Sequence, residues 1–154
     1  MITLLPMTPE AFAIFDKLSR EDFAQSKTRG EKLSMAEGIR IAESAWDTVI
    51  PHGQATPGHH FFTAWNDGLD IGMIWFKEER DWATPYAYLY QVWIWDEFQG
   101  QGLGRALMKA LEAKCLEYNL ARIRLHVFAF NERAHKLYRS MGFETTNVVM
   151  LKDL

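Results

Sequence analysis

The sequence contains a single cysteine, Cys115, among 154 residues, so no disulfide can form within the chain. It has no apolar run of about 18 residues, the length that a membrane-spanning helix needs. Its first thirty residues hold Glu10, Asp16, Glu21 and Asp22 and no signal-peptide core. We therefore expect a cytoplasmic protein without a membrane partner.

Repeats, low-complexity segments and linkers are also absent, and 48% of the residues are apolar. A chain of this length builds one hydrophobic core and is too short for two comfortable ones. We expect a single α/β domain over residues 1–154. The net charge of −3 and the lack of a basic-aromatic surface motif argue against a nucleic-acid partner.

The charge is divided unevenly between the two parts of the chain. Residues 1–98 carry a net charge of −7, whereas residues 99–154 carry +4. A basic part suits an anionic cofactor and an acidic part suits a cationic substrate. A chance excess of charges on solvated faces explains the same numbers equally well.

Helix-start signals are clear at two places near the N-terminus. Thr8-Pro9 reads as an N-cap followed by proline in the first turn, and Ser34-x-x-Glu37 reads as a capping box. Between these helices, Lys27 to Lys32 reads as a polar connection. The remaining expected elements are strands at 2–5, 60–65, 71–76, 86–95 and 123–128, with a turn at 66–68; helices from 102 to about 118 and after Asn131; and one or two closing strands at 143–151.

A glycine-rich stretch, Gln99-Gly100-Gln101-Gly102-Leu103-Gly104-Arg105, joins the strand that ends near Trp95 to a helix. Such a turn exposes backbone N–H groups at the positive end of a helix dipole, which suits a phosphate. The G-x-G-x-x-G fingerprint of dinucleotide sites fails here in both registers, and the Gly-Lys-Ser/Thr of a Walker A loop is missing. What is present is Gln-x-x-Gly-x-Gly.

With this loop, the chain resembles the GCN5-related N-acetyltransferases, in which the same motif wraps the pyrophosphate of acetyl-CoA. Asn131 and the stretch from Tyr138 to Phe143 follow at the spacing seen in that family, so the specific resemblance covers roughly residues 86–143. It implies a mixed, mostly antiparallel sheet flanked by helices, with splayed central strands. It also implies transfer of an acetyl group from acetyl-CoA to a primary amine, by direct attack through a tetrahedral intermediate.

The resemblance assigns the cofactor contacts to three segments. In the family the strand before the loop splays from its neighbour and holds the pantetheine arm by free backbone groups, and one N–H polarises the thioester carbonyl. The expected cofactor-binding residues are therefore Val92, Trp93, Ile94, Gln99, Gly100, Gln101, Gly102, Leu103, Gly104, Arg105 and Asn131. For Trp93 and Trp95, packing in the wall is the expected role rather than chemistry.

Tyr138 is the expected general acid, seven residues after Asn131, because family members with this spacing protonate the departing thiolate with such a tyrosine. A core tyrosine on an apolar helix stripe is the alternative. His126 is the candidate general base, at a place where some relatives carry a glutamate, and a histidine that only serves the strand is an equal alternative. Asp96, Glu97 and ordered water remain open as the base.

His52, His59 and His60 lack the cysteines or paired carboxylates of a metal site, so no metal is expected. Two other functions stay open: transfer from another acyl-CoA donor, and a CoA-binding sensor or interaction domain without turnover. The acceptor is a small-molecule or peptide amine that the sequence does not name. The chain is expected to be a monomer or a homodimer.

Overall fold

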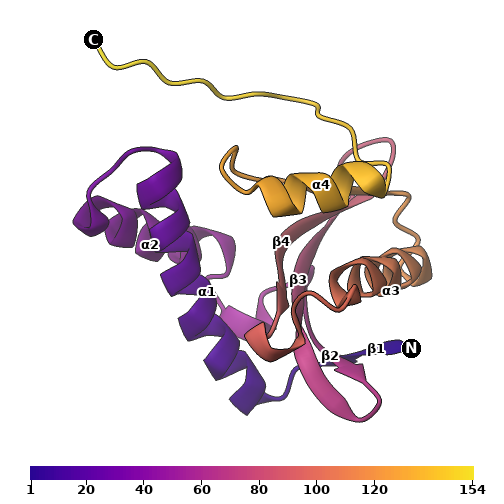
Figure 1. Cartoon of the computed structure of the whole chain (residues 1–154). Coiled ribbons are helices and arrows are strands. Elements are labelled where there is room, and N and C mark those ends of the chain that lie inside the picture. The colour runs from indigo at the N-terminus through magenta and orange to yellow at the C-terminus, as the bar shows by residue number, and fades with distance from the viewer.

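The computed structural model describes all residues from 1 to 154 and contains one five-stranded sheet with helices on both faces (Figure 1). The strands are β1 (Ile2–Pro6), β2 (His59–Asn66), β3 (Leu69–Glu79), β4 (Tyr86–Ile94) and β5 (Arg122–Leu125). The helices are α1 (Pro9–Gly30), α2 (Met35–Val49), α3 (Leu103–Glu117) and α4 (Glu132–Ser140), with short 3₁₀ turns η1 (Gly53–Ala55) and η2 (Asp96–Phe98).

The sheet order is β1-β2-β3-β4-β5, antiparallel from β1 to β4 and parallel between β4 and β5. The expected mixed, mostly antiparallel sheet is therefore confirmed. The hairpin between β2 and β3 turns at Asp67 and Gly68, which both have positive φ angles of 50° and 79°. The predicted turn at 66–68 is thus correct, since this hairpin turn needs left-handed backbone at both central residues.

Residues along the strands alternate between two cores. On β3, Ile74 and Phe76 face a cluster with α3, which also receives the apolar side of α4. Met73 and Trp75 face the opposite cluster, where they meet Phe15 of α1 and residues of α2. The helices α1 and α2 therefore cover one face of the sheet, and α3 and α4 cover the other (Figure 1).

The helix caps lie where the sequence places them. Thr8 accepts a hydrogen bond from the Ala11 amide, Ser34 and Glu37 form the complete capping box, and Asn131 accepts from the Ala134 amide. Between the first two helices, however, the expected connection at 27–32 is wrong, because α1 runs on to Gly30. Packing extends this helix: α1 lies so close to α2 that a Cβ on Gly38 would sit 2.1 Å from the Thr28 hydroxyl.

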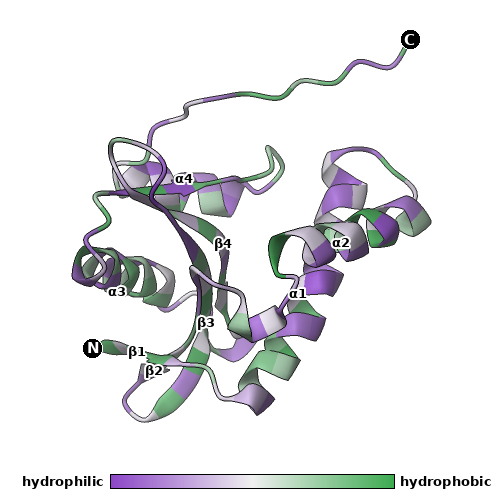
Figure 2. Ribbon diagram, turned by 180° about the vertical axis from the view of Figure 1, so that it is seen from behind, coloured by the Kyte–Doolittle hydropathy of each residue, from purple (hydrophilic) through white to green (hydrophobic).

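Two strand expectations near the C-terminus are also wrong. The strand expected at 123–128 ends at Leu125, because β4 and β5 diverge there and offer no further partner. No strand forms at 143–151; residues 144–154 leave α4 as an extended tail whose backbone makes no hydrogen bond. Figure 2 shows this tail standing away from the body, with hydrophobic residues along it. No helix is long and apolar enough to cross a membrane.

Candidate active site

The central feature of the site is the point where β4 and β5 part. β4 pairs with β5 only from Tyr86 to Leu89, whereas it pairs with β3 as far as Ile94. A bulge marks the parting, since Leu89 lies opposite Phe76 and Gln91 opposite Trp75, which leaves Tyr90 unpaired. The β5-facing edge of β4 beyond Leu89 therefore has no strand partner. Val92, Trp93 and Ile94 lie on this free edge.

The glycine-rich loop follows η2 directly and opens α3. Gly100 and Gly102 have φ angles of 75° and 76°, and a Cβ built on either would meet no protein atom within 4 Å. Gly102 is the N-cap of α3 and contributes no side chain to it. No backbone N–H from Gly100 to Arg105 has an acceptor in the protein. A run of unbonded N–H groups at a helix N-terminus is well suited to hold an anion.

Side chains of the loop hold its shape. The Gln99 amide donates to the Ile94 carbonyl at 3.0 Å and to Asp96 at 2.9 Å, and its oxygen accepts from Arg133 of α4 at 3.0 Å. At the other end of α4, Arg105 donates to the Ser140 hydroxyl. Gln99 is therefore engaged within the protein, so any ligand contact of the loop falls to the backbone. The Asn131 oxygen, similarly, is used by the cap of α4.

Tyr138 lies on α4, on the same side of the sheet as α3. Its ring packs against Phe143 with 5.4 Å between the centroids, and its hydroxyl has no hydrogen-bond partner in the protein. Burial raises the pKa of this phenol above its usual value, so the hydroxyl stays protonated at neutral pH. The hydroxyl proton of Tyr138 is therefore not engaged in any hydrogen bond within the protein.

His126 lies directly after β5, at the parting point, and on the side of α1. Desolvation lowers the pKa of His126, the charge of Lys27 lowers it further, and Glu31 acts in the opposite direction. Its ring meets Phe128 edge-to-face at 4.7 Å. An imidazole in this setting is neutral at pH 7 and has a lone pair available for a proton.

Asp22 is a further candidate that the sequence did not reveal. It lies on α1, and its carboxylate accepts a weak hydrogen bond from the Gln91 amide of β4 at 3.5 Å. Burial raises the pKa of Asp22, while the bond from Gln91 opposes the shift. No pattern in the sequence points to it, because Asp22 and Gln91 are 69 residues apart. Asp22 and His126 both lie on the α1 side, opposite Tyr138.

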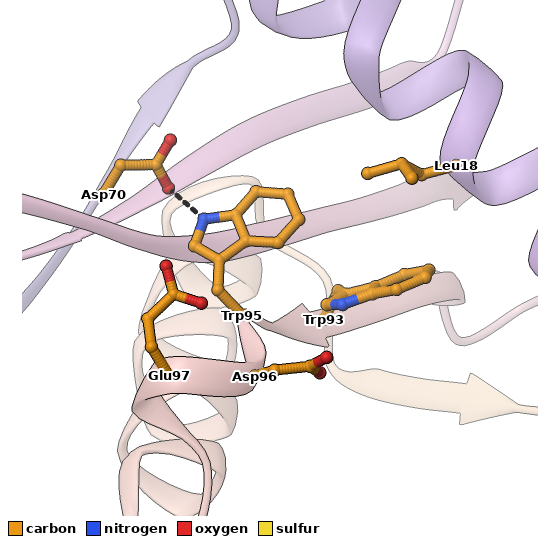
Figure 3. Close-up of a pocket in the computed structure, with 6 residues that line it drawn as sticks. All are labelled: Leu18, Asp70, Trp93, Trp95, Asp96 and Glu97. Atoms are coloured by element: carbon orange, nitrogen blue, oxygen red, sulfur yellow. Dashed lines mark hydrogen bonds between the residues drawn. The ribbon is translucent and has the colours of Figure 1, made fainter.

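An open pocket of about 410 Å³ lies at the C-terminal end of β4 (Figure 3). The indoles of Trp93 and Trp95 form its apolar wall together with Leu18 of α1. Three carboxylates complete the lining: Asp70, Asp96 and Glu97. Asp70 fixes the Trp95 ring by accepting from its indole N–H at 2.8 Å.

None of the three carboxylates forms an ion pair, because no basic side chain lies within 4 Å of them. Indole faces and unpaired carboxylates both attract cations. The tryptophans expected in the wall are thus present, and the acids Asp96 and Glu97 lie with them rather than with His126.

The other histidines are engaged elsewhere. His59 accepts from the Trp75 indole at 2.9 Å within the α1–α2 side core, and its pKa is lowered to about 4, chiefly by desolvation. His60 contacts Glu78 at 2.6 Å. No group of three or more His, Cys, Asp or Glu side chains is arranged to hold a metal ion.

Comparison with known proteins places the chain among acetyltransferases. A model of the acetyltransferase (GNAT) family matches residues 20–143. The chain is 32% identical over 153 residues to YdgE of Bacillus subtilis, named an uncharacterized N-acetyltransferase, covering 99% of this chain and 98% of that protein. It is 28% identical to YycN of the same organism over 99% of both chains.

Solved structures share the fold. The crystal structure of YycN superposes with a TM-score of 0.95 at 27% identity, covering 100% of this chain and 99% of that one. The aminoglycoside N-acetyltransferase AAC(6')-Iy, solved with CoA, covers 100% and 95% with a TM-score of 0.64 at 15% identity, which shows a common fold alone.

Proposed function

The chain belongs to the acetyltransferase (GNAT) family and is an acyl-CoA-dependent N-acetyltransferase, and from this premise we propose that residues 1–154 form one catalytic unit that moves an acetyl group from acetyl-CoA to a cationic primary amine. The observation that carries the proposal is the run of unbonded N–H groups from Gly100 to Arg105, placed beside the free edge of β4.

These two features match an extended anionic thioester. The backbone of Gly100 to Arg105 would hold the pyrophosphate, and the glycines leave it open because no Cβ stands in the way. The free edge from Val92 to Ile94 would pair with the amide-containing pantetheine arm. Acetyl-CoA supplies an activated acyl group when bound. Its phosphates also account for the basic C-terminal part of the chain.

We propose direct transfer to the amine without an acyl-enzyme. Cys115 is the chain's one thiol; it lies on the buried face of α3, and burial raises its pKa to about 12. It is therefore protonated and out of reach, so it does not act as a nucleophile. Instead the amine nitrogen attacks the thioester carbonyl while backbone N–H groups of β4 stabilise the oxygen. Tyr138, from the opposite side, donates its proton to the departing sulfur.

The base that receives the proton of the ammonium lies on the α1 side. His126 is neutral at pH 7 and stands at the parting of β4 and β5, so it remains the first candidate. Asp22 is the second, because its raised pKa makes it a better proton acceptor than an ordinary aspartate and its partner Gln91 lies on the free part of β4.

The acceptor side favours an amine that carries a second positive charge. Trp95 follows Gln91 by four residues, which corresponds to about 13 Å along a strand. A reacting amine near Gln91 would thus leave the far end of a chain-like acceptor against Trp95 and the carboxylates of Asp70, Asp96 and Glu97. Long polyamines have this spacing between their terminal charges when extended, and so do lysine-like side chains next to other cations.

Two alternatives make different demands. A longer acyl-CoA donor requires space beside Val92 for more methylene groups. A CoA-binding sensor requires no proton donor, yet the Tyr138 hydroxyl has no structural partner that would otherwise explain it. The second alternative is therefore the weaker one.

The test is a free-thiol assay with acetyl-, propionyl- and butyryl-CoA against monoamines, diamines, polyamines and carboxylate-bearing amines. We expect acetyl-CoA with long polyamines to give the highest kcat/KM, with a preference that fades as salt screens the charges. The charge of the pocket is tested by Asp70→Asn, since asparagine keeps the acceptor oxygen for Trp95 and Gly72. KM for the polyamine should rise while KM for acetyl-CoA stays unchanged.

The matched control is Asp67→Asn, which makes the same charge change three residues earlier, in the exposed turn between β2 and β3. Asparagine tolerates the positive φ of Asp67, so the fold should not change. Carboxylate-rich acceptors outperforming cationic ones, or equal effects of the two variants on KM, would contradict the proposed acceptor. CoA binding without turnover on any amine would instead favour the sensor.

A further inference from the structure

Helix α4, which carries Tyr138, is attached to the core by one narrow apolar stripe. None of its nine residues is fully buried, and its apolar contacts come from Leu137 and Tyr138, with Met141 just beyond its end. Apolar packing is not directional, so this stripe fixes the distance of α4 from the sheet more firmly than its shift along its own axis. The place of the Tyr138 hydroxyl therefore depends on the polar contacts of α4.

Three hydrogen bonds between side chains and other elements hold α4 in place: His135 to the Phe128 carbonyl at 3.2 Å, Arg105 to Ser140, and Arg133 to the Gln99 oxygen at 3.0 Å. The first reaches the segment after β5, and the second comes from α3. The third differs from both, because Gln99 is itself bonded to β4 through the Ile94 carbonyl at 3.0 Å.

Gln99 thus links the helix of the proposed acid to the strand whose free edge would hold the thioester. Its amide nitrogen donates to Ile94, the last residue of β4, and its oxygen accepts from Arg133 of α4. One planar amide therefore spans the two elements, and a movement of either one strains a hydrogen bond. Arg133 precedes Tyr138 by five residues, which is about 7.5 Å along a helix, so this link ends close to the hydroxyl.

The electrostatics of α4 alone would not favour an arginine at residue 133. Arg133 is the second residue of the helix, where the positive end of the helix dipole disfavours a cation. No carboxylate forms an ion pair with it. Arg139, in contrast, lies in the last turn, where the dipole favours a cation. The bond to Gln99 is therefore the contact within the protein that accounts for Arg133.

We propose that Arg133 is a positioning residue that acts through Gln99 to hold the Tyr138 hydroxyl in line with the departing sulfur. This inference rests on the proposed function, in which Tyr138 protonates the thiolate, and adds a residue that touches neither substrate. Without the bond, α4 still packs on the core, but the hydroxyl is displaced from the sulfur for part of the time. A displacement of about 1 Å can lower a rate by about 100-fold.

The first test is Arg133→Met, which removes the donor and keeps a similar helix propensity. We expect kcat to fall by about 10- to 100-fold. KM for acetyl-CoA and Kd for CoA should stay unchanged, because Gln99 keeps its bonds to Ile94 and Asp96. Arg133→Lys should recover most of the lost turnover, since a single N–H of Arg133 makes the bond to Gln99.

The matched control is Arg139→Met, which makes the same substitution on the same helix at an exposed side chain without an ion pair. It should turn over like the wild type. Because the dipole favours Arg139 and disfavours Arg133, a loss of helix stability alone would lower kcat more in Arg139→Met. Equal losses of kcat in the two variants would therefore contradict the proposal.

A double-mutant cycle with Tyr138→Phe identifies the group through which Arg133 acts. Once the hydroxyl is gone, Arg133→Met should change kcat by less than about 3-fold, because the two residues act as one unit. A full additional loss, or wild-type turnover by Tyr138→Phe itself, would overturn the inference. A raised Kd for CoA with wild-type kcat would do so too, because Arg133 would then contact a phosphate.

Amide hydrogen exchange over residues 132–140 measures the attachment of α4 without turnover. Exchange should be faster in Arg133→Met than in the wild type and in Arg139→Met. An active enzyme whose Arg133→Met variant keeps both its kcat and its exchange in α4 would overturn this inference alone. A wild type that releases no thiol from acetyl-CoA with any amine would instead overturn the proposed function, and this inference with it.

Discussion

The glycine at the start of α3 offers the sharpest test of the cofactor site, through Gly102→Val. Gly102 has a φ angle of 76°, a left-handed conformation that costs a residue with a Cβ about 1–2 kcal/mol. The added side chain meets no protein atom within 4 Å, so it projects into open space beside the unbonded N–H groups. In the proposed complex that space belongs to the pyrophosphate.

A matched control separates strain from binding. Gly68, in the turn between β2 and β3, has a φ angle of 79° and equally open surroundings. Gly68→Val should therefore carry the same backbone strain as Gly102→Val, and both variants should melt about 2–8 °C below the wild type. Affinity for CoA should fall in Gly102→Val alone. Each N–H contact to a charged group is worth about 1.5–3 kcal/mol, so loss of one raises Kd roughly 10- to 150-fold.

The assay is calorimetric titration of each variant with CoA at one fixed salt concentration, preceded by thermal melts. Unchanged CoA affinity in a folded Gly102→Val variant would refute the assignment of the loop to the pyrophosphate. Equal weakening in Gly68→Val would show that strain, not the position of the side chain, is responsible.

Four further predictions concern protons. Tyr138→Phe should keep the fold and the CoA affinity but lower kcat by about 10²- to 10⁴-fold in stopped-flow or steady-state assays, if thiolate departure limits the rate; wild-type turnover would remove its role as the acid. If His126 is the base, the rate should decline as the pH falls through the pKa of His126, which lies below about 6.5. His126→Gln should abolish this decline of the rate at low pH. A decline that persists in the variant would move the role of base to Asp22. Ionised Asp22 destabilises the fold because its folded pKa is raised, so Asp22→Asn should raise the melting temperature at pH 7 and lose this advantage as the pH falls toward 3.8. The folded pKa of His59 is lowered to about 4, so urea titrations should show stability falling between about pH 6.5 and pH 4, and His59→Gln should remove that dependence.

The parts of the fold that the sequence predicts well are set by interactions a few residues apart. The caps at Thr8, Ser34 and Asn131 each satisfy an amide within three residues. The glycine loop is equally local, because its N–H groups are displayed by the backbone of six consecutive residues. Such features depend little on the rest of the chain, so their sequence signals remain valid in the folded protein.

The parts that the sequence misses depend on distant partners. α1 continues through the polar residues 27–30 because its end packs on the segment after β5. The packing is close enough that a Cβ on Gly30 would overlap the Phe128 ring. The pattern at 123–128 is that of a strand, but β4 turns away and pairing stops at Leu125. At 143–151 the composition is strand-like, but the fold offers this segment no strand to pair with, so its backbone from residue 144 onward makes no hydrogen bond.

The general base illustrates the same limit within the site. A sequence search looks for an acid on the strands, and Gln91 is the neutral residue found there. In three dimensions α1 brings the Asp22 carboxylate to the Gln91 amide of β4, so an acidic group lies beside this strand although the strand's own sequence has none there. α1 and α2 cover one face of the sheet and α3 and α4 the other, so in the mechanism that we propose the base on α1 and the acid on α4 lie on opposite faces. In that mechanism the amine and the thioester meet where β4 and β5 part after Leu89, and the free backbone groups of β4, rather than charged side chains, contact the thioester.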